Sequence, residues 1–332
     1  MNMPDPLSWL LEPQDPGVRY LALRDLLDLS PEDPQLAAAR QAAHTHGPIA
    51  AILDNMHPQG YWAKPGAGYN PKYYASAWSL IALAQVGASA SLDIRISRAC
   101  EYILQAALTS RGQFSMNGSP SATIDCLQGN LCAALVTLGC RDPRLDLAFE
   151  WMARSVTGEG LAPTQERDAP LRYYMAKCGP LFACGYNGQL SCAWGAAKVM
   201  LAFSRWPAAR RTPLMERAIQ QGVDFLFSRD LALADYPTRN DAKPSANWRK
   251  FGFPVFYVTD ILQVLEALVA LGYANDPRLT NALELVRHKQ DEQGRWALEY
   301  SYTGKTWVDF GPTKQPNKWV TLRALKILKA IG

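Results

Sequence analysis

The sequence has few histidines and no long hydrophobic run. Only 4 of its 332 residues are His, and no apolar stretch is long enough to predict a membrane-spanning helix. The first residues lack the basic and apolar segments of a secretory signal, so we expect a cytoplasmic protein. Strand signals are almost absent. The sequence also lacks a glycine-rich phosphate loop, a Gly-x-Ser-x-Gly elbow and a His-Glu-x-x-His motif.

Charge of one sign is also scarce. The chain carries 34 Lys and Arg against 30 Asp and Glu, and this net charge of +4 gives no reason to expect nucleic acid as a partner. Seven cysteines, an odd number, argue against a complete disulfide framework. In a reducing compartment, clustered thiols are metal ligands, catalytic groups or core residues. At 48% hydrophobic residues, the chain can bury a large core.

Internal repeats are the main structural signal. Residues 133–152 and 266–286 share one pattern, in which an apolar helix ends in Leu-Gly and Asp-Pro-Arg-Leu opens a second helix. Weaker copies begin at Leu26 and Ser79. Glycine is favoured just after a helix, and proline in its first turn. Each repeat is therefore predicted to be a helix, a tight turn and a second, more polar helix.

The repeats predict two layers of helices. The more apolar first helices form an inner layer, and six inner helices would close a ring. We therefore expect a single domain over residues 1–332, an all-α (α/α) toroid of about five to six helical hairpins. The inner helices are predicted to start near Val18, Tyr74, Cys126, Cys192, Thr259 and Trp319.

One motif suggests a family. Gln290, Gly294 and Trp296 form Gln-x-x-x-Gly-x-Trp, with degenerate copies at residues 57–62 and 110–114. At this phase of a helical repeat, the motif resembles that of terpenoid cyclases and, more loosely, protein prenyltransferase β-subunits. The resemblance extends over nearly the whole chain, which looks like the stand-alone bacterial members of this superfamily. The physical role expected of the motif is to tie an outer helix to the next repeat.

Three thiols are predicted to meet at one end of the ring. Cys126 and Cys192 occupy the same repeat position on neighbouring inner helices, and Cys184 lies in the Gly-rich loop before Cys192. We predict that they cluster and are candidate ligands of zinc, with Asp125 or Cys178 as a fourth ligand. The alternatives are buried, inert cysteines or a redox or nucleophilic thiol.

The zinc site of the prenyltransferases does not transfer as a whole. The resemblance implies an Asp and a Cys at one inner-helix start and a His from a later inner helix. Here Asp125 and Cys126 are adjacent, and no His stands at an inner-helix start. Cys184 and Cys192 would have to replace the histidine.

Candidate acids also stand at inner-helix starts. Terpenoid cyclases protonate an alkene with an Asp-x-Asp-Asp acid, and this sequence has no such run. Asp125 and Asp260 are the nearest substitutes, since a desolvated carboxyl group can act as a catalytic acid. The alternative is that each carboxylate caps its helix.

Basic and aromatic residues gather before the inner helices. They suit a small apolar or prenyl-type molecule with an anionic head, bound in an apolar cavity that opens at the amino-terminal rim. The cavity is predicted to contain Trp62, Tyr74 and Trp319, with Lys72 or Lys318 near its mouth. The candidate substrate-binding residues are Trp62, Lys72, Tyr74, Tyr257, Lys318 and Trp319.

Three functions remain open at this point. The first is a prenyltransferase- or terpene-cyclase-like enzyme that acts on an isoprenoid or other apolar substrate in the central cavity. The second is a non-catalytic toroid that binds a ligand or a protein. The third is a carbohydrate-active lyase or hydrolase, which needs a carboxylate pair or a Tyr–His set and is weakened by the lack of inner histidines.

Overall fold

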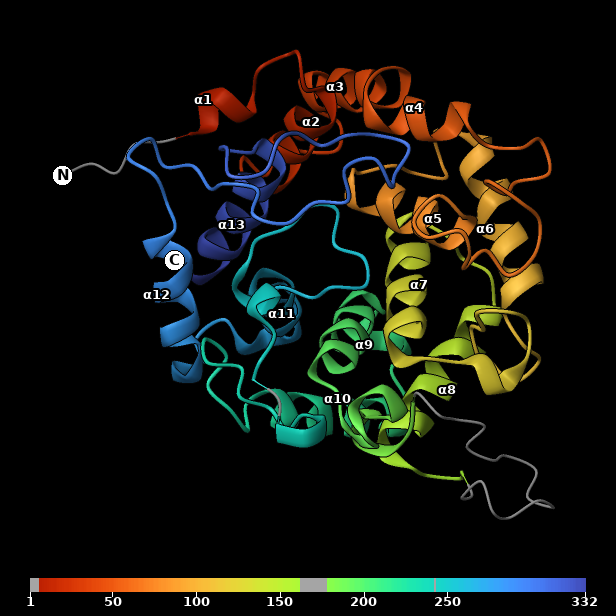
Figure 1. Ribbon diagram of the computed structural model, residues 1–332. Coiled ribbons are helices and arrows are strands. Elements are labelled where there is room, and N and C mark those ends of the chain that lie inside the picture. Colours follow the sequence, from red (N-terminus) through yellow and green to blue (C-terminus); the bar gives the residue numbers. More distant parts are fainter. Residues whose placement is uncertain (1–5, 162–177, 242) are drawn as a thin grey trace.

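Figure 1 shows a ring of helices with an inner and an outer layer in the computed structural model, which describes residues 6–161, 178–241 and 243–332. The all-α toroid is confirmed. Six helices surround the centre, namely α2 (Pro16–Asp25), α5 (Ser76–Gln85), α7 (Asp125–Thr137), α9 (Ala193–Arg205), α11 (Ile261–Leu268) and α13 (Lys318–Ile331). Each starts within two residues of its predicted position.

The outer layer alternates with the inner one along the chain. It consists of α3 (Pro34–Thr45) with α4 (Pro48–Asp54), α6 (Ile94–Ala107), α8 (Arg144–Thr157), α10 (Pro213–Leu226) and α12 (Thr280–His288). The short α1 (Leu7–Leu10) precedes the ring. One small antiparallel hairpin, β1 (Ala183–Cys184) with β2 (Leu190–Ser191), precedes α9. Short 3₁₀ segments are η1 (Pro120–Ala122), η2 (Pro180–Phe182), η3 (Gly185–Asn187), η4 (Ala208–Arg210), η5 (Arg239–Asp241), η6 (Ala246–Arg249) and η8 (Pro277–Leu279), and η7 (Val269–Tyr273) is a π-helical extension of α11.

The inner helices pack in sequence around the ring, from α5 to α7, α9, α11, α13 and α2. The last junction, between α2 and α5, depends on small residues. A Cβ added to Gly87, just after α5, would lie 2.8 Å from the Leu21 side chain of α2. Gly87 has φ 85°, so both its conformation and this close approach favour glycine.

The outer helices begin at caps that the Asp-Pro pattern predicted. Asp33 accepts hydrogen bonds from two backbone N–H groups of α3, and Asp276 accepts one from the Arg278 N–H of η8 before α12. Proline follows each of these two caps, where its missing N–H costs nothing. Side chains of the inner helices are more completely buried, as in α5, where residues 76–84 are all buried.

Trp296 and Trp62 of the repeat motif each join an outer helix to the next inner helix through the same two hydrogen bonds. The Trp296 indole donates to the carbonyl of Val286 in α12, and its backbone N–H donates to Thr321 Oγ1 in α13. Trp62 repeats both bonds, to the carbonyl of Ile52 in α4 and to Ser76 Oγ in α5. The motif therefore ties an outer helix to the next inner helix, as expected.

The two ends of the ring differ in the length of their connections. Short turns follow the inner helices, whereas longer loops precede them and gather towards the viewer in Figure 1. Residues 250–258 cross the centre, where Val255 exchanges two backbone–side-chain hydrogen bonds with Gln85. The Phe256 ring stacks on Tyr73 at 5.2 Å, beside Tyr302. This aromatic plug (residues 250–258 with Tyr73 and Tyr302) closes the centre on the amino-terminal side.

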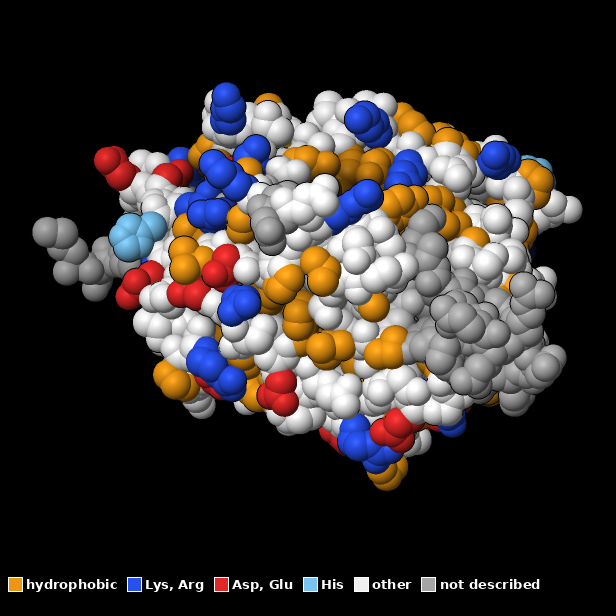
Figure 2. All heavy atoms as spheres, turned by 60° about the horizontal axis from the view of Figure 1, so that its bottom comes forward, with side chains coloured by type: hydrophobic (Ala, Val, Ile, Leu, Met, Phe, Trp, Pro, Cys, Tyr) orange, Lys and Arg blue, Asp and Glu red, His pale blue; other side chains and the backbone are white. Residues whose placement is uncertain are grey.

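Two further findings concern the whole molecule. Within the described ranges, no helix is both long and apolar enough to cross a membrane. On the face in Figure 2, Lys and Arg side chains are spread among acidic and apolar ones.

Candidate functional site

A pocket of about 290 Å³ opens at the amino-terminal ends of α7 and α9. We call it the amino-terminal pocket. Its wall combines thiols, one carboxyl group and aromatic rings from the loops before α9 and α11. The lining residues with carboxyl, thiol, amide or aromatic side chains are Asp125, Cys126, Cys184, Tyr186, Asn187, Cys192, Trp194, Tyr236, Trp248 and Tyr257.

The structure brings the three predicted cysteines together in this wall. The hairpin of β1 and β2 returns Cys184 to the start of α9, because Cys192 N–H donates to the carbonyl of Phe182 across it. The hydrogen bond of the Cys192 thiol with Cys126 is the largest cause that raises the pKa of Cys192 to about 12, and burial also raises it. The pKa of Cys184 is raised mainly by its own hydrogen bond with Cys192 and by burial. The pKa values of Cys184 and Cys192 therefore both lie above that of a free thiol.

Among the described residues, these side chains are not arranged as the donor set of a zinc site. A metal ligand must be the thiolate, and zinc needs about four donors directed at one point. Among the residues that the structure describes, no group of three or more His, Cys, Asp or Glu side chains is placed to hold a metal ion. Cys178, the candidate fourth ligand, is buried against Trp151 and Leu161 and is not part of the pocket wall.

Asp125 is the carboxyl group of the pocket. It occupies the first position of α7 and is only 5% exposed. Burial raises its pKa well above the ordinary value, and the neighbouring Cys184 raises it further. The side chain has room because Gly195 faces it, where an added Cβ would lie 3.2 Å from Asp125 Cβ. Asp125 forms no ion pair with the described residues, so no cation offsets the cost of ionising this buried carboxyl group.

A buried lysine lies behind the thiols. Lys198 of α9 is fully buried, and its Nζ donates to Thr259 Oγ1 at 2.5 Å and to Gln263 Oε1 at 3.0 Å. Burial lowers its pKa to about 8, while nearby Cys126 raises it in part. A lysine without a carboxylate partner in its hydrogen-bonding shell is uncommon in a protein core.

Aromatic rings make up the rest of the pocket wall. Tyr257 and Trp194 meet edge to face with ring centroids 6.0 Å apart. Trp248 and Tyr236 form the opposite, buried part of the wall, with centroids 5.7 Å apart. Lys72 does not line the pocket, but its Nζ lies 4.7 Å from the Tyr257 ring centroid. Aromatic faces of this kind stabilise a cation within the pocket.

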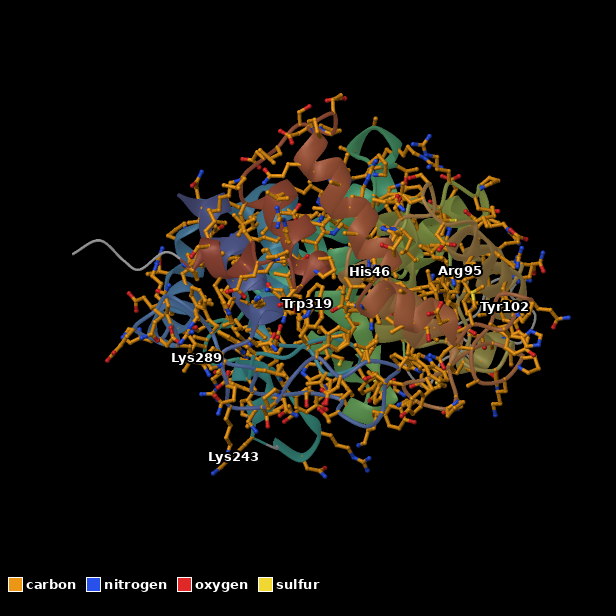
Figure 3. All side chains as sticks on the ribbon, turned by 90° about the horizontal axis from the view of Figure 1, so that it is seen from above. His46, Arg95, Tyr102, Lys243, Lys289 and Trp319 are labelled. Carbon is orange, nitrogen blue, oxygen red and sulfur yellow. The ribbon has the colours of Figure 1, made fainter. Side chains whose placement is uncertain are left out.

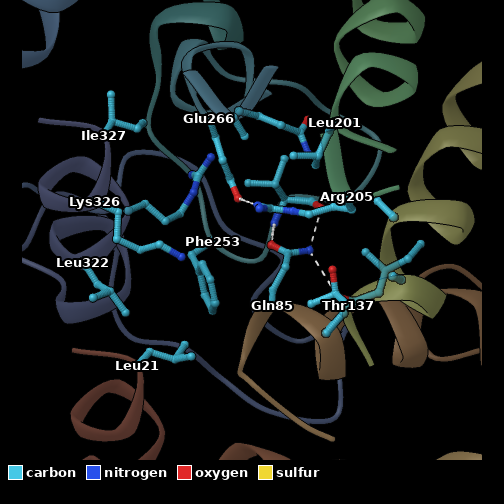
Figure 4. Close-up of a pocket in the computed structure, with 18 of the residues that line it drawn as sticks. Leu21, Gln85, Thr137, Leu201, Arg205, Phe253, Glu266, Leu322, Lys326 and Ile327 are labelled. Atoms are coloured by element: carbon cyan, nitrogen blue, oxygen red, sulfur yellow. Dashed lines mark hydrogen bonds and ion pairs between the residues drawn. The ribbon is translucent and has the colours of Figure 1, made fainter. Parts of the chain in front are cut away.

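A larger cavity of about 670 Å³ occupies the centre of the ring. We call it the central cavity (Figure 4). It is lined by residues from all six inner helices, mostly from their carboxyl-terminal halves, and Phe253 and Val255 of the plug form its floor. Arg205 of α9 and Lys326 of α13 approach it from opposite walls in Figure 4. It therefore opens at the carboxyl-terminal rim, opposite to the rim that the sequence predicted.

The predicted substrate-binding residues separate in the structure. Trp319 is 7% exposed, lies inside the fold in Figure 3, and lines the central cavity stacked on Phe253. Tyr257 lines the amino-terminal pocket. Trp62 and Tyr74 line neither cavity, since Trp62 is fully buried in its repeat and the Tyr74 hydroxyl donates to the carbonyl of Gly304.

Lys318 and Asp260 are held in ion pairs. Lys318 bridges Glu12 and Asp15 near α1, away from either cavity. Asp260 receives two hydrogen bonds of 2.7 Å from Arg323 and also caps α11 by accepting from Gln263 N–H. Both oxygens of the Asp260 carboxylate are thus occupied by Arg323 and by the helix cap, and the group lines neither cavity. Of the two candidate acids, the geometry therefore favours Asp125.

Several residues of the two cavities and their surroundings were not predicted from the sequence. Lys198 is the single charge near the middle of the apolar stretch 193–203, and Asn130 and Gln263 are isolated polar residues in apolar inner helices. An isolated polar residue on a predicted buried helix signals either a polar network or a binding site. Trp194, Tyr236 and Trp248 carry no comparable signal.

No family model matches the sequence, and no curated protein matches it. Among solved structures, the type II terpene cyclase MstE from Scytonema, bound to its product merosterolic acid A, matches with TM-score 0.34 and 12% identity over 88% of this chain and 96% of that one. The same enzyme with geranylgeranyl dihydroxybenzoate gives TM-score 0.33 and 13% identity over 89% and 97%. A protein from Actinoplanes gives TM-score 0.33 and 14% identity over 89% and 99%. At these TM-scores, the matches assign no residue role and no reaction.

Proposed function

We propose that this chain is an enzyme that protonates an alkene of an apolar, isoprenoid-type substrate in the amino-terminal pocket. The observation that carries the proposal is the buried carboxyl group of Asp125, which lies in a pocket wall of aromatic rings and has no cation as a partner among the described residues. A raised pKa at a cavity wall is a recurrent feature of catalytic acids. Alkene protonation needs such an acid because the alkene is a very weak base.

The proposed reaction starts with transfer of the Asp125 proton to one alkene carbon, which leaves a carboxylate and a carbocation. Attack of a second alkene on the cation closes a ring. Loss of a proton to water ends the reaction, and the carboxylate is reprotonated from solvent, so the product is an isomer of the substrate. Trp194, Tyr257 and Trp248 would stabilise the cation through their ring faces, and their bulk would exclude water from it.

The substrate class rests on the sequence. The Gln-x-x-x-Gly-x-Trp motif resembles that of terpenoid cyclases, which act on isoprenoid substrates. A pocket of about 290 Å³ suits a short prenyl chain. The reaction is placed in this pocket and not in the central cavity because Asp125 lines the former.

The test is isotopic. The protein is incubated in D₂O with farnesol and, in parallel, with geraniol. The products are separated by gas chromatography, and their masses are measured by mass spectrometry. A cyclic isomer that has gained one carbon-bound deuterium is expected, because the Asp125 proton exchanges with solvent before it is transferred. Activity should also be lost as the pH rises through the raised pKa of Asp125.

Asp125→Asn should abolish deuterium uptake, because an amide cannot donate a proton to an alkene. Asp276→Asn is the matched control, since Asp276 is a helix cap far from the pocket. Unlabelled products, or equal labelling by the wild type and Asp125→Asn, would exclude Asp125 as the acid.

Zinc at Cys126, Cys184 and Cys192 stays a prediction from the sequence, and the proposed reaction uses no metal. Metal analysis of protein purified without chelators tests it. About one zinc per chain that is lost in Cys126→Ser, with helical content retained, would support a zinc site. A metal-free wild-type protein would contradict it.

Ligand binding without catalysis is the second candidate function, and the central cavity favours it. This cavity has the larger volume, and its carboxylates are held by cations, as in the Arg205–Glu266 pair. A carbohydrate-active site is less well supported, because Asp125 is the one carboxyl group among the described residues of the amino-terminal pocket wall.

A further inference from the structure

Two buried amide side chains stand near the floor of the central cavity. Asn130 of α7 and Gln263 of α11 both line the cavity, and each is only 4% exposed. Polar groups at such depth normally have all their hydrogen-bonding atoms paired. Each of these amides pairs one of its two polar atoms with the protein.

The orientation of both amides follows from their protein partners. Asn130 Nδ2 donates to the carbonyl of Phe256 at 2.9 Å. The Asn130 atom without a protein partner is therefore the oxygen Oδ1. Gln263 Oε1 accepts from Lys198 Nζ at 3.0 Å. The Gln263 atom without a protein partner is therefore the nitrogen Nε2. A carbonyl cannot donate and an ammonium cannot accept, which excludes the flipped arrangements.

One acceptor and one donor therefore remain. Within the described part of the chain, Asn130 Oδ1 and Gln263 Nε2 make no hydrogen bond to protein, and neither is sealed from the cavity by surrounding atoms. Leaving such groups without a partner costs about 1–3 kcal/mol each. The floor thus offers a donor and an acceptor to whatever occupies the cavity.

The remaining walls exclude a charged head group. They are mostly apolar, with Leu21, Ile81, Leu201 and Leu322 among them. The charged side chains that line the cavity already have partners, as in the pairs Arg205–Glu266, Lys326–Asp25 and Arg323–Asp260. The unfilled polar positions at the floor are neutral, one donor and one acceptor.

We propose that the central cavity is a binding site for a neutral apolar alcohol, with the hydroxyl group at the floor and the apolar body along the walls. The hydroxyl oxygen accepts from Gln263 Nε2, and its hydrogen is donated to Asn130 Oδ1. A hydroxyl group can both donate to an amide oxygen and accept from an amide N–H, whereas an ether or a ketone can only accept. This site is separate from the Asp125 pocket and does not depend on the proposed reaction.

The depth of the cavity sets the length of a suitable probe. Asn130 at the floor and Thr137 at the rim are seven residues apart on α7, which corresponds to about 10 Å along a helix. An extended decyl chain has a comparable length. Decanol and methoxydecane therefore form a matched pair that differs in one donor hydrogen.

Equilibrium dialysis of the full chain against each probe tests the site. The wild type should bind decanol about tenfold more tightly than methoxydecane, the ratio expected for one net hydrogen bond. Gln263→Glu keeps an acceptor for Lys198 but replaces the cavity-facing donor with an acceptor. It should weaken decanol binding about tenfold, with helical content unchanged.

A cavity-filling variant locates the binding. Ala134→Phe places a ring among the lining residues and should abolish binding of both probes, whereas Thr137→Val, at the exposed rim of the same helix, should leave it unchanged. Equal affinity of the wild type for decanol and methoxydecane would overturn the proposal, even if Gln263→Glu fails to fold. Undiminished binding in a folded Ala134→Phe variant, or no binding of decanol by the wild type, would do so as well.

Discussion

The buried lysine Lys198 gives a quantitative test of the structure. Its amino group lies in the core between α9 and α11, with hydroxyl and amide oxygens as partners. Charging it there costs free energy because neither partner carries a negative charge. We predict that this cost appears as a pH-dependent difference between the wild type and Lys198→Met.

The size of the effect follows from the pKa. Burial lowers the pKa of Lys198 from 10.5 to about 8, a difference of 2.5 units. At 1.36 kcal/mol per unit, this corresponds to about 3 kcal/mol. Between these two pH values the unfolded chain holds the proton and the folded chain does not, so stability rises with pH. Below pH 8 both states are protonated, and the full cost is present.

The assay is chemical denaturation of both proteins at a series of pH values from about 7 to 10.5. The free energy of unfolding of the wild type should rise relative to the variant by about 3 kcal/mol over this range. Taking the difference in unfolding free energy between the wild type and Lys198→Met removes the contributions of other titrating groups. It also removes the constant cost of leaving Thr259 and Gln263 without their partner in the variant.

Charged and titratable neighbours also shift the pKa of Lys198. Cys126, Cys192 and Asp260 raise the pKa of Lys198, and Arg323 lowers it, but burial is the largest cause. An exposed-lysine control, Lys314→Met, should give a flat difference over the same range. A flat difference for Lys198→Met would refute the buried, carboxylate-free placement of the amino group.

Three further predictions concern stability. Asp125→Asn should become more stable relative to the wild type as the pH rises above 3.8, because the folded chain resists ionisation of this buried carboxyl group; denaturation midpoints across pH 3 to 8 measure this. Gly129→Ala should destabilise the fold by about 1–3 kcal/mol in urea denaturation, since its Cβ would lie 2.5 Å from the Lys198 carbonyl carbon and the helix-propensity gain of about 1 kcal/mol is smaller. Asp260→Asn should lower the free energy of unfolding by about 3 kcal/mol, because it leaves the Arg323 guanidinium buried without its carboxylate, and unchanged stability would show that this ion pair is dispensable.

The architecture was predictable because its signals are local and repeated. Leu-Gly followed by Asp-Pro marks the end of one helix and the start of the next, and the structure has helix boundaries at these points. The motif at Trp296 was likewise predictable as a structural tie, since a buried indole N–H needs an acceptor nearby. Equal repeat positions placed Cys126 and Cys192 together correctly.

The cavities were not predictable in the same way. No local sequence pattern indicated that residues 250–258 would cross the ring and close its centre, because the hydrogen bonds between Val255 and Gln85 join residues far apart in the chain. With that plug in place, Trp319 faces one cavity and Tyr257 the other. The predicted set of substrate-binding residues is therefore divided between the two cavities and positions outside both.

The plug also explains why the two cavities differ in chemistry. An inner helix such as α7, with 13 residues, spans about 20 Å, so a crossing loop leaves roughly half of that length on either side. On the amino-terminal side, long loops bring a buried acid, thiols and aromatic rings together. On the carboxyl-terminal side, the connections are short, and ion pairs such as Arg205–Glu266 offset the charge of the helix ends. Lys198 connects the two halves, because it lies beside Cys126 and holds Gln263 in the orientation that turns its Nε2 towards the central cavity.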